Sequence, residues 1–325
     1  MNKLSKILVT GGAGFIGGHL VSLLASRGHR VLVVDNLYSG RREYVPEGAE
    51  FVNLDLALAD ESAVSGIIRC FRPDAVIHLA AIHYIPHCLA NPSETFLANV
   101  RSTDVIARAL RGLSTRKLIA ASTADVYPLI DEIHKESETP APSNPYGLSK
   151  FLLEEIIAGA ARSNAGLSCV ALRIFNVYGP RDTNPHVIPR IIELLHGSLP
   201  EIRMGAIETT RDFIHVDDVV HAIYAALTHE SAEYEVFNVG TGRATSIRDL
   251  LRILMEAAGD KRSIVQDKNL FRTYDRPSLT SDITKITAAL DWRPMIGLEE
   301  GLAQLVQQAN PIPTEIDPSR PLAQF

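Results

Sequence analysis

The chain has 325 residues, of which 46% are hydrophobic and 22% are charged. This length allows one large α/β unit or two domains that share a cleft, and the apolar fraction suits a sizeable core. The net charge of −6 argues against a nucleic-acid-binding protein, because such proteins normally present a basic face.

The first half of the chain alternates short apolar runs with segments of helical periodicity. Buried strands are predicted over five apolar runs, at residues 6–10, 30–35, 75–79, 117–121 and 168–172. Helices are predicted around them, near residues 14–27, 60–71, 93–112 and 145–163. Strands that alternate with helices indicate right-handed crossovers and a parallel sheet with helices on both faces. The sequence therefore predicts an α/β fold with a doubly wound parallel sheet of the Rossmann type.

The rhythm changes after Arg173, where several prolines divide the chain into short pieces. Helices are predicted near residues 186–196, 216–228, 246–258, 282–290 and 298–309, with Ser246 as a helix cap and a strand at 235–238. This pattern favours a smaller α/β lobe that is interleaved with the first domain. We expect a Rossmann domain at residues 1–175, to which segments near 213–238 return, a second lobe mainly at 176–309, and a proline-rich tail at 310–325.

A glycine-rich turn follows the first predicted strand, in Thr10-Gly-Gly-Ala-Gly-Phe-Ile-Gly17. Gly12, Gly14 and Gly17 satisfy the Gly-x-Gly-x-x-Gly fingerprint of dinucleotide-binding proteins, and Gly11 also gives the variant Gly-x-x-Gly-x-x-Gly. Glycine permits a tight turn from strand to helix and a close approach of the backbone to a pyrophosphate, which then lies at the helix N-terminus. An ordinary glycine-rich turn is the alternative, but the flanking strand and helix favour a cofactor loop.

A carboxylate ends the second predicted strand at Asp35, 18 residues after Gly17. At this position it would accept hydrogen bonds from ribose hydroxyls and repel a 2′-phosphate. Arg41 and Arg42 would suit a phosphate, although arginines in such a loop are more often solvated surface charges. NAD is therefore the predicted cofactor, in preference to NADP.

Tyr146 and Lys150 share one face of a predicted helix, in Tyr146-Gly-Leu-Ser-Lys150. The pKa of tyrosine is ordinarily about 10, and an ammonium one helical turn away favours the phenolate. We therefore expect Tyr146 to act as a general base whose pKa Lys150 lowers. Thr123 follows the strand predicted at 117–121 and could hydrogen-bond the same substrate oxygen. The alternative is a helix surface pair and a strand-end threonine, which the preceding cofactor loop disfavours.

Ordered motifs along residues 5–309 resemble those of the nucleotide-sugar epimerase/dehydratase family of extended short-chain dehydrogenases/reductases. The motifs that carry this resemblance are Thr10–Gly17, Asp35-Asn-Leu37, His78-Leu-Ala-Ala81, Asn99, Ser122-Thr123, Tyr146–Lys150, Arg173-Ile-Phe-Asn-Val-Tyr-Gly-Pro180 and Arg211-Asp-Phe-Ile-His-Val-Asp-Asp218. The resemblance implies an enzyme that binds NAD mainly in residues 1–175 and a nucleotide-diphosphate sugar mainly in residues 176–309.

The resemblance also implies roles for individual residues. It implies cofactor contacts at Gly11, Gly14, Phe15, Ile16, Gly17, Asp35, Asn36, Asp55, Leu56, Leu79, Ala80, Ala81, Asn99, Tyr146 and Lys150. It implies substrate contacts at Thr123, Asn176, Val187, Arg211 and Arg276. The chemistry of the two arginines agrees, because a diphosphate needs cationic, multidentate donors. Ion pairs of these arginines with the adjacent Asp212 and Asp275 are the structural alternative.

Two departures from the family pattern bear on the reaction. Ala124 and Asp125 follow Thr123, where sugar-nucleotide 4,6-dehydratases usually carry Asp and Glu. Ala124 cannot protonate a departing hydroxyl, and Asp125 is a shorter carboxylate where UDP-glucuronate decarboxylases often carry Glu. The loop at residues 82–88 is bulkier and richer in imidazole than is usual in the family. We expect His83 in this loop to contact the substrate, with a purely structural histidine as the alternative.

The predicted function is an NAD-dependent nucleotide-sugar 4-epimerase that works through a transient 4-keto sugar, most simply that of a UDP-hexose. Tyr146, Lys150 and Thr123 are the predicted catalytic residues. A UDP-glucuronate decarboxylase or another 4-keto-forming nucleotide-sugar dehydratase is the nearer alternative. A non-catalytic NAD-sensing regulator is disfavoured, because such proteins tend to lose the tyrosine–lysine pair.

The helices predicted at 93–112 and 145–163 carry apolar residues at helical spacing. The relevant residues are Val105, Ile106, Ala109 and Leu110 in the first and Phe151, Leu152, Glu155 and Ile156 in the second. By the resemblance, these helices would pair with their copies in a homodimer. The alternative is that both stripes pack on the chain's own sheet.

Cys70, Cys88 and Cys169 are widely spaced and show no metal-ligand pattern. We therefore expect no metal site and a reducing compartment. No leader sequence precedes the first predicted strand, and no apolar stretch reaches the roughly 18 residues that cross a bilayer. The expectation is a cytoplasmic protein without membrane contact.

Overall fold

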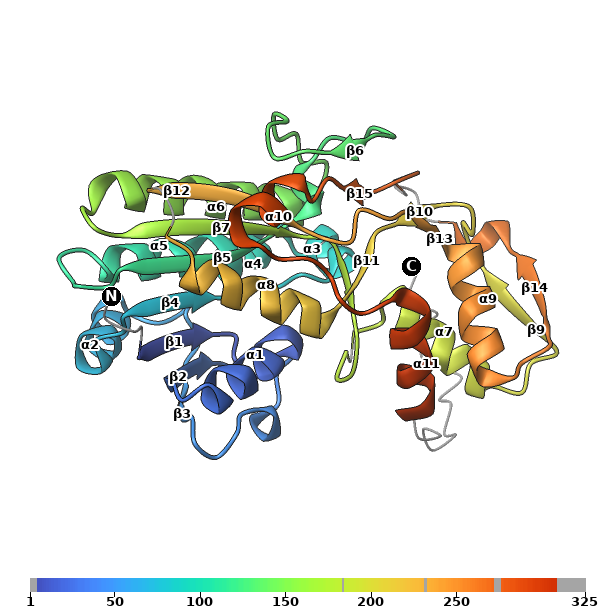
Figure 1. Cartoon of the computed structure of the whole chain (residues 1–325), viewed down its shortest axis with the longest axis horizontal. Coiled ribbons are helices and arrows are strands. Elements are labelled where there is room, and N and C mark those ends of the chain that lie inside the picture. The colour runs from blue at the N-terminus through green and yellow to red at the C-terminus, as the bar shows by residue number, and fades with distance from the viewer. Residues whose placement is uncertain (1–4, 183, 231–232, 272–275, 309–325) are drawn as a thin grey trace.

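Seven strands form one parallel sheet in the larger lobe (Figure 1). The computed structural model describes residues 5–182, 184–230, 233–271 and 276–308. The strands are β1 Lys6–Thr10, β2 Arg30–Asp35, β3 Glu50–Asn53, β4 Ala75–His78, β5 Lys117–Thr123, β7 Ser168–Ile174 and β12 Tyr234–Val239. They lie in the order β12-β7-β5-β4-β1-β2-β3, and all neighbours are parallel. Because the order grows outward from β1 in both directions, the predicted doubly wound α/β fold is confirmed.

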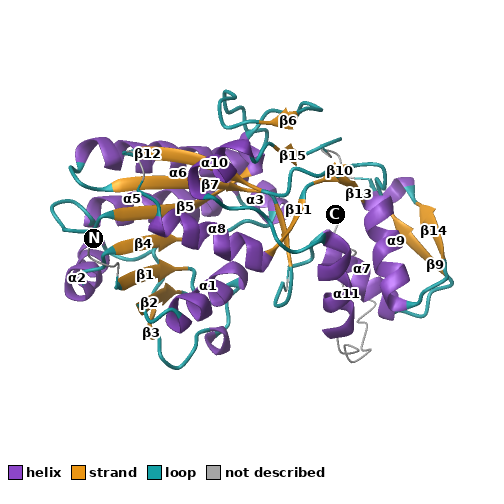
Figure 2. Ribbon diagram, in the orientation of Figure 1, coloured by secondary structure: helices purple, strands orange, loops and turns teal. Residues whose placement is uncertain are grey.

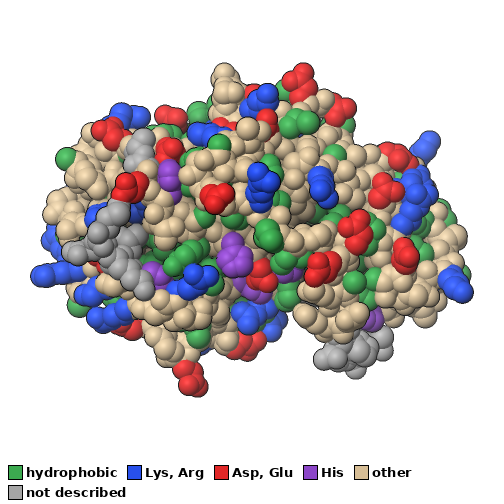
Figure 3. Space-filling view, viewed as in Figure 1, with side chains coloured by type: hydrophobic (Ala, Val, Ile, Leu, Met, Phe, Trp, Pro, Cys, Tyr) green, Lys and Arg blue, Asp and Glu red, His purple; other side chains and the backbone are tan. Residues whose placement is uncertain are grey.

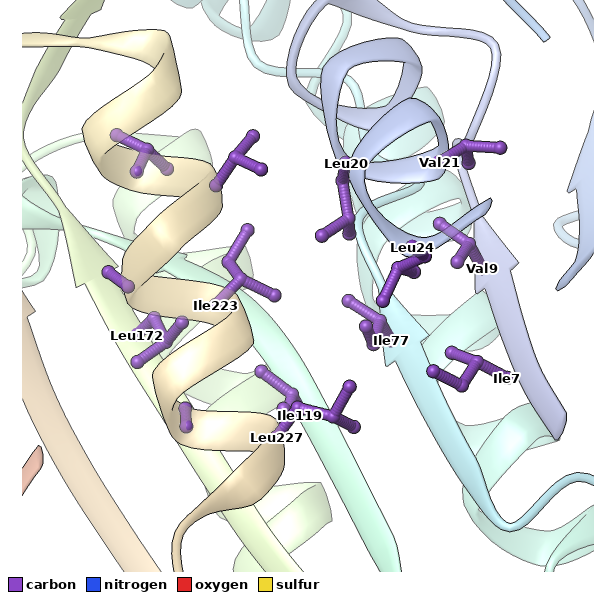
Figure 4. Packing of buried hydrophobic residues seen from close by; sticks show 14 of the residues in the cluster. Ile7, Val9, Leu20, Val21, Leu24, Ile77, Ile119, Leu172, Ile223 and Leu227 are labelled. Atoms are coloured by element: carbon purple, nitrogen blue, oxygen red, sulfur yellow. The ribbon is translucent and has the colours of Figure 1, made fainter. Parts of the chain in front are cut away.

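Helices cover both faces of this sheet (Figure 2). One face packs on α1 Phe15–Ser26, α8 Val216–Thr228 and α10 Thr284–Leu290, and the other on α2 Glu61–Phe71, α5 Ser102–Ala109 and α6 Pro145–Ser163. Side chains of β1 alternate between the faces, with Ile7 and Val9 on the α1 side and Leu8 on the α2 side. Figure 4 shows Ile7 and Val9 against Leu24 and Ile77, with Ile223 of α8 nearby. Burial on both faces explains why these strands are continuous apolar runs.

The structure differs from the predicted elements at three places in the first half. β3 was not predicted, because this edge strand is short and only partly buried. α3 Ile85–Ala90 begins in the loop expected at residues 82–88 and extends two residues beyond it. The helix predicted at 93–112 consists of α4 Pro92–Phe96, the π-helix η2 Leu97–Arg101 and α5. α3 has Pro86 at its second position and α4 begins with Pro92; proline is compatible with the first turn of a helix because its missing N–H would be unpaired there.

The smaller lobe has its own apolar core, on the right in Figure 1. It contains α7 Val187–His196, α9 Ile247–Ala258, α11 Leu298–Gln308 and the parallel pair β9 Glu201–Met204 and β14 Ser263–Gln266. The predicted cap of α9 is confirmed, since the Ser246 hydroxyl accepts a hydrogen bond from the Asp249 N–H at 3.0 Å.

Short elements connect the lobes. They are β6 Ile133–His134 with β15 Thr280–Ser281, β8 Asn176–Tyr178 with β11 Phe213–His215, and β10 Thr210–Arg211 with β13 Thr245–Ser246. The 3₁₀ helices η1 Arg42–Tyr44, η3 Ala124–Val126 and η4 Lys268–Leu270 follow β2, β5 and β14, respectively. α8 and β12 return to the large sheet after the chain has entered the smaller lobe, so the lobes are interleaved. We propose that the domain boundary lies at residues 175–176, as predicted. The tail expected at 310–325 lies outside the described residues.

Acidic and basic side chains are interspersed over the face shown in Figure 3. Within the described ranges, no helix is both long and apolar enough to cross a membrane. Among the same residues, no group of three or more His, Cys, Asp or Glu side chains is arranged to hold a metal ion.

Candidate active site

A cavity of about 980 Å³ lies at the carboxyl ends of the parallel strands and reaches the smaller lobe. Such a position, at the point where the strand order reverses, is the usual ligand site of a doubly wound sheet. Most of the predicted site residues line it: Gly11, Gly14, Phe15, Ile16, Gly17, Asp35, Asn36, Asp55, Leu56, Leu79, Ala80, Ala81, His83, Thr123, Tyr146, Lys150, Asn176, Val187 and Arg211. Asn99 and Arg276 are not among its lining residues.

The glycine-rich turn has a backbone that only glycine can adopt without displacement. Gly11 has a φ of +69°, and a Cβ there would lie 2.6 Å from the Ala80 nitrogen. A Cβ on Gly17 would lie 2.1 Å from the Gly11 oxygen. Gly14 has an extended backbone and immediately precedes α1. It has no side chain that could accept hydrogen bonds from the first N–H groups of the helix, and the first residues of the helix line the cavity. This cradle fits the pyrophosphate of a dinucleotide.

Asp35 is buried at the end of β2, beside the glycine-rich turn. Its Oδ2 accepts the Ala13 N–H at 3.0 Å, and its Oδ1 accepts the Leu37 N–H at 2.7 Å. These bonds fix the carboxylate, and each oxygen keeps acceptor capacity for a ribose hydroxyl. The geometry therefore suits the predicted NAD ribose contact.

The loop that carries the predicted cofactor contacts Asp55 and Leu56 is held by an arginine that sequence reasoning missed. Asn36 donates from Nδ2 to Asp55 Oδ2 at 3.0 Å, which ties the ends of β2 and β3 together. Arg101 donates to the carbonyl oxygens of Leu56 at 3.2 Å and Ala59 at 2.9 Å. Arg101 thus stabilises the loop after β3, although its sequence position gave no sign of this role.

A buried hydrogen-bond chain supports the floor of the cavity. Thr103 donates to the Asn99 carbonyl at 2.6 Å, so its oxygen can accept a hydrogen bond from His78 Nε2 at 3.0 Å. His78 Nδ1 then accepts the Thr10 hydroxyl at 2.7 Å, and the Thr10 oxygen accepts the Ala80 N–H at 3.3 Å. Burial lowers the pKa of His78 to about 3, so the imidazole is neutral. A neutral ring that donates from Nε2 can accept at Nδ1, in agreement with the two contacts above.

Asn99 extends this support toward α6, the helix that carries Tyr146 and Lys150. Its Oδ1 accepts the Ile82 N–H at 2.8 Å, and its Nδ2 donates to the Ile82 carbonyl and to Ser149 Oγ, each at 2.9 Å. Ser149 in turn donates to the Tyr146 carbonyl at 2.7 Å. The structure places the Asn99 amide among protein groups, so its predicted direct contact with the cofactor stays a prediction, and positioning of the cavity wall is the role its contacts show.

Thr123, Tyr146 and Lys150 meet at the cavity floor. Thr123 is the last residue of β5. The start of α6 packs closely against the segment after β5, so a Cβ on Gly147 would lie 2.3 Å from the Asp125 backbone carbonyl oxygen. Asn144 caps α6 by accepting the Gly147 N–H at 2.8 Å. The close packing brings the Tyr146 phenol within hydrogen-bond reach of the Thr123 side chain.

The electrostatics of the pair differ from the expectation. Burial raises the pKa of the Tyr146 phenol well above its usual range, Asp125 raises it further, and the hydrogen bond from Thr123 opposes both. Lys150 Nζ donates to the Ala121 carbonyl at 2.9 Å and lies 6.0 Å from the centre of the Tyr146 ring. The expectation that Lys150 sets a low phenol pKa is therefore wrong, because burial dominates. Burial also lowers the pKa of Lys150 to about 8.

The substrate side of the cavity contains one unpartnered acceptor. Asn176 lines the cavity, and its Oδ1 is buried without a hydrogen-bond partner among the described residues. Buried polar atoms are normally paired, so a ligand donor is the natural partner. Val187 lines the same region from α7.

The two predicted diphosphate arginines occupy different places. Arg211 lines the cavity and donates from Nη1 to the carbonyls of Thr210 and Arg276, each at 2.8 Å. Arg276 is only 6% exposed, and its guanidinium donates to the carbonyls of Tyr127 at 2.8 Å and Pro128 at 3.1 Å. Arg276 therefore lies behind Arg211 in this structure, and its direct substrate contact stays a prediction.

His83 lies with two polar residues that sequence reasoning did not assign. Its ring centre is 5.6 Å from that of His186, and His186 Nδ1 is 3.0 Å from Asp182 Oδ2. All three residues line the cavity. Burial lowers the pKa of His83 to about 4, and the neighbouring His186 contributes in the same direction. His83 is thus a neutral group where a substrate contact is predicted. The spacing of residues in the sequence gives no sign that residue 83 lies near residues 182 and 186.

A buried ion pair lies behind β5, the strand that ends at Thr123, and was also missed by sequence reasoning. Glu154 of α6 accepts hydrogen bonds from Arg173 Nε at 3.0 Å and Nη2 at 2.8 Å, and from the Ser122 hydroxyl. These contacts join β5, β7 and α6 directly below Thr123.

Comparison with known proteins agrees with this geometry. A family model described as the NAD dependent epimerase/dehydratase family matches residues 7–240. The chain belongs to this family. It is 34% identical over 313 residues to a putative UDP-glucose 4-epimerase of Methanocaldococcus jannaschii, with 92% of this chain and 97% of the relative covered.

Solved structures give the same picture. The UDP-glucose 4-epimerase of Thermotoga maritima with UDP-glucose superposes with a TM-score of 0.84 and 34% identity, covering 93% of this chain and 97% of that chain. The UDP-glucose 4-epimerase of Thermus thermophilus with NAD gives a TM-score of 0.84 and 34% identity, covering 94% and 100%. Family membership confirms the predicted enzyme class and its cofactor, NAD.

Proposed function

We propose that this chain is an NAD-dependent nucleotide-sugar 4-epimerase that acts on a UDP-hexose. The observation that carries the proposal is the meeting of Tyr146, Thr123 and Lys150 in one cavity with the glycine cradle. The same cavity offers Asn176 and Arg211 to a second, anionic ligand from the smaller lobe. The relatives that are named UDP-glucose 4-epimerases support the same reaction.

NAD, when bound in the cradle, supplies a reversible hydride acceptor for the sugar carbon. Tyr146 then removes the proton of the C4 hydroxyl and returns it after the 4-keto sugar has turned in the pocket. Thr123 holds the same oxygen by a hydrogen bond. Because burial keeps the free phenol protonated, Tyr146 needs additional positive charge to give up its proton; the oxidised nicotinamide ring would add its charge to that of Lys150, whose ammonium lies 6.0 Å from the centre of the phenol ring. Arg211 and Asn176 would keep the diphosphate anchored while the sugar rotates.

A decarboxylase is the second candidate, and Asp125 is the observation that favours it. Asp125 lines the cavity and is close enough to Tyr146 to raise the pKa of the phenol. Asn144 Nδ2 donates to Asp125 Oδ1 at 3.4 Å, so the carboxylate already has a structural partner. Ala124 beside it is buried and can donate no proton.

Product analysis by NMR distinguishes these functions. Incubation with UDP-, dTDP- and GDP-sugars is expected to give reversible interconversion of C4 epimers of a UDP-hexose, without net change in NADH absorbance. Release of carbon dioxide from UDP-glucuronate, together with inactivity on neutral hexose nucleotides, would replace the epimerase by the decarboxylase.

We also propose a homodimer, in which Leu152 of the second predicted stripe takes part but the first predicted stripe does not. Val105, Ile106, Ala109 and Leu110 are buried against the chain's own sheet, so that stripe cannot form an interface. Leu97, Leu148 and Leu152 are exposed by 46%, 40% and 36% on the π-helix and α6. Leu89 of α3 is exposed by 49%, and α3 packs on α6. An apolar surface shared by neighbouring helices suits an isologous contact.

Light scattering tests the dimer. The expected mass is twice the chain mass of 35.5 kDa at micromolar concentration, and Leu148→Glu should reduce it to that of the monomer. Leu199→Glu in the smaller lobe is the matched control, since Leu199 is exposed on another surface. A monomeric parent protein would contradict the proposal.

We retain a cytoplasmic location as a proposal, supported by three cysteines that are all free.

A further inference from the structure

Arg181 has an unusual backbone at the border of the two lobes. It follows Gly179 and Pro180 and has a φ of 71°, in the left-handed region that residues other than glycine rarely adopt. Such conformations persist where surrounding contacts over-determine them, and they concentrate at functional sites. One of these contacts is visible, because His19 Nε2 of α1 lies 3.1 Å from the Pro180 carbonyl and fixes the turn against that helix.

The turn directs the Arg181 side chain across the cavity to the cofactor side. Its Cζ lies 4.9 Å from the centre of the Tyr44 ring, in stacking contact. Its Nη1 lies 3.3 Å from the position that a Cβ on Gly18 would take, beside the first turn of α1. Arg181 and Tyr44 both line the cavity.

Nearby carboxylates are engaged elsewhere. Asp182 accepts from the Asn184 N–H at 3.2 Å and lies against His186. Asp35 accepts two backbone N–H groups. Within the described parts of the chain, no carboxylate is in ion-pair contact with the Arg181 guanidinium. Its charge is therefore available to a ligand of the cavity, beside the helix that follows the glycine-rich turn.

We propose that Arg181 binds the pyrophosphate of NAD, with Tyr44 as the platform that orients its guanidinium. The start of α1 offers only backbone N–H groups, whereas a guanidinium adds a full positive charge and paired donors for phosphate oxygens. Arg181 comes from the border of the smaller lobe, so this contact closes the cofactor groove from the opposite side. The inference rests on the assignment of NAD as the cofactor and not on which sugar is epimerised.

The diphosphate of the nucleotide sugar has the same chemistry and is the competing source. Geometry favours the dinucleotide, because the groups around Arg181 belong to α1, which follows the glycine-rich turn, and to η1: they are Gly18, His19 and Tyr44. Arg211 instead lines the substrate side from β10.

Exchange of bound NAD for radiolabelled NAD in the purified full-length holoenzyme tests the proposal. Arg181→Gln should exchange NAD at least tenfold faster than the parent, and added salt should accelerate the variant less. Arg181→Lys keeps the charge and serves as a second variant. Arg42→Gln is the matched control: Arg42 also stacks on an aromatic ring, Phe51, at 4.9 Å, but it does not line the cavity. Its exchange rate should remain within twofold of the parent.

Two results would overturn the proposal. One is NAD exchange within twofold of the parent in both Arg181 variants. The other is a tenfold weaker affinity for UDP in NAD-loaded Arg181→Gln with unchanged NAD exchange, which would assign the residue to the substrate. Because NAD exchange is measured without a sugar, failure of this inference is distinguishable from failure of the epimerase assignment.

Discussion

The buried ammonium of Lys150 should destabilise the folded protein at neutral pH. Its removal should therefore raise the free energy of unfolding while activity is lost. The ammonium is only 2% exposed, and burial lowers its pKa from the usual 10.5 to about 8. Below pH 8 the folded state must therefore hold a buried charge that the unfolded chain exposes to water. We expect Lys150→Met to be more stable than the parent at pH 7 and to lose activity.

The magnitude follows from the two pKa values. A decrease of this size corresponds to about 3 kcal/mol of destabilisation at neutral pH. Loss of the hydrogen bond to the Ala121 carbonyl offsets about 1 kcal/mol, so a net gain of about 2 kcal/mol is expected. Between pH 8 and 10.5 the unfolded state binds the additional proton, so the contribution of Lys150 to stability rises with pH. From pH 7 to 9.5 this rise amounts to about 2 kcal/mol in the parent and is absent in the variant.

Urea unfolding at pH 7 and 9.5, with NAD removed, measures this difference. Lys117 also has a pKa lowered by burial to about 8, but it contributes equally to both proteins. Lys117→Met is therefore a useful control, because it should lose the same pH-dependent rise while keeping activity: its ammonium contacts the Ala226 carbonyl, away from the cavity. An identical change in unfolding free energy from pH 7 to 9.5 in the parent and in Lys150→Met would refute the reasoning.

Three further predictions concern the reaction. Tyr146→Phe should keep the fold and bind NAD but lower kcat by about 10²–10⁴-fold, since only the proton acceptor is lost; turnover within tenfold of the parent would contradict the role. Asp35→Ala should weaken NAD binding in calorimetry and relax the preference over NADP, because two backbone N–H groups lose their acceptor and the repulsion of a 2′-phosphate disappears; an unchanged preference would remove Asp35 from the ribose site. Asp125→Asn should leave 4-epimerisation within about tenfold of the parent, below the range typical of a lost acid or base, whereas a severe loss in assays of purified enzyme would favour the decarboxylase.

Features that depend on local geometry could be predicted from the order of the amino acids alone. The spacing from Gly11 to Gly17, the position of Asp35 at a strand end and the helical pairing of Tyr146 with Lys150 each require only a few neighbouring residues. The main strands were predictable for a similar reason, since burial on both faces produces continuous apolar runs. The edge strand β3 was not predicted, because its partial burial leaves only a weak hydrophobic pattern in the sequence.

Contacts between groups that are distant in the chain, and the depth of their burial, became known from the folded structure. His83 lies beside His186, Glu154 pairs with Arg173, and Arg181 stacks on Tyr44 across long stretches of chain that share no periodicity. Burial also reversed the expected direction of the Tyr146 pKa shift, because desolvation depends on every element packed around the phenol and not on the lysine one turn away.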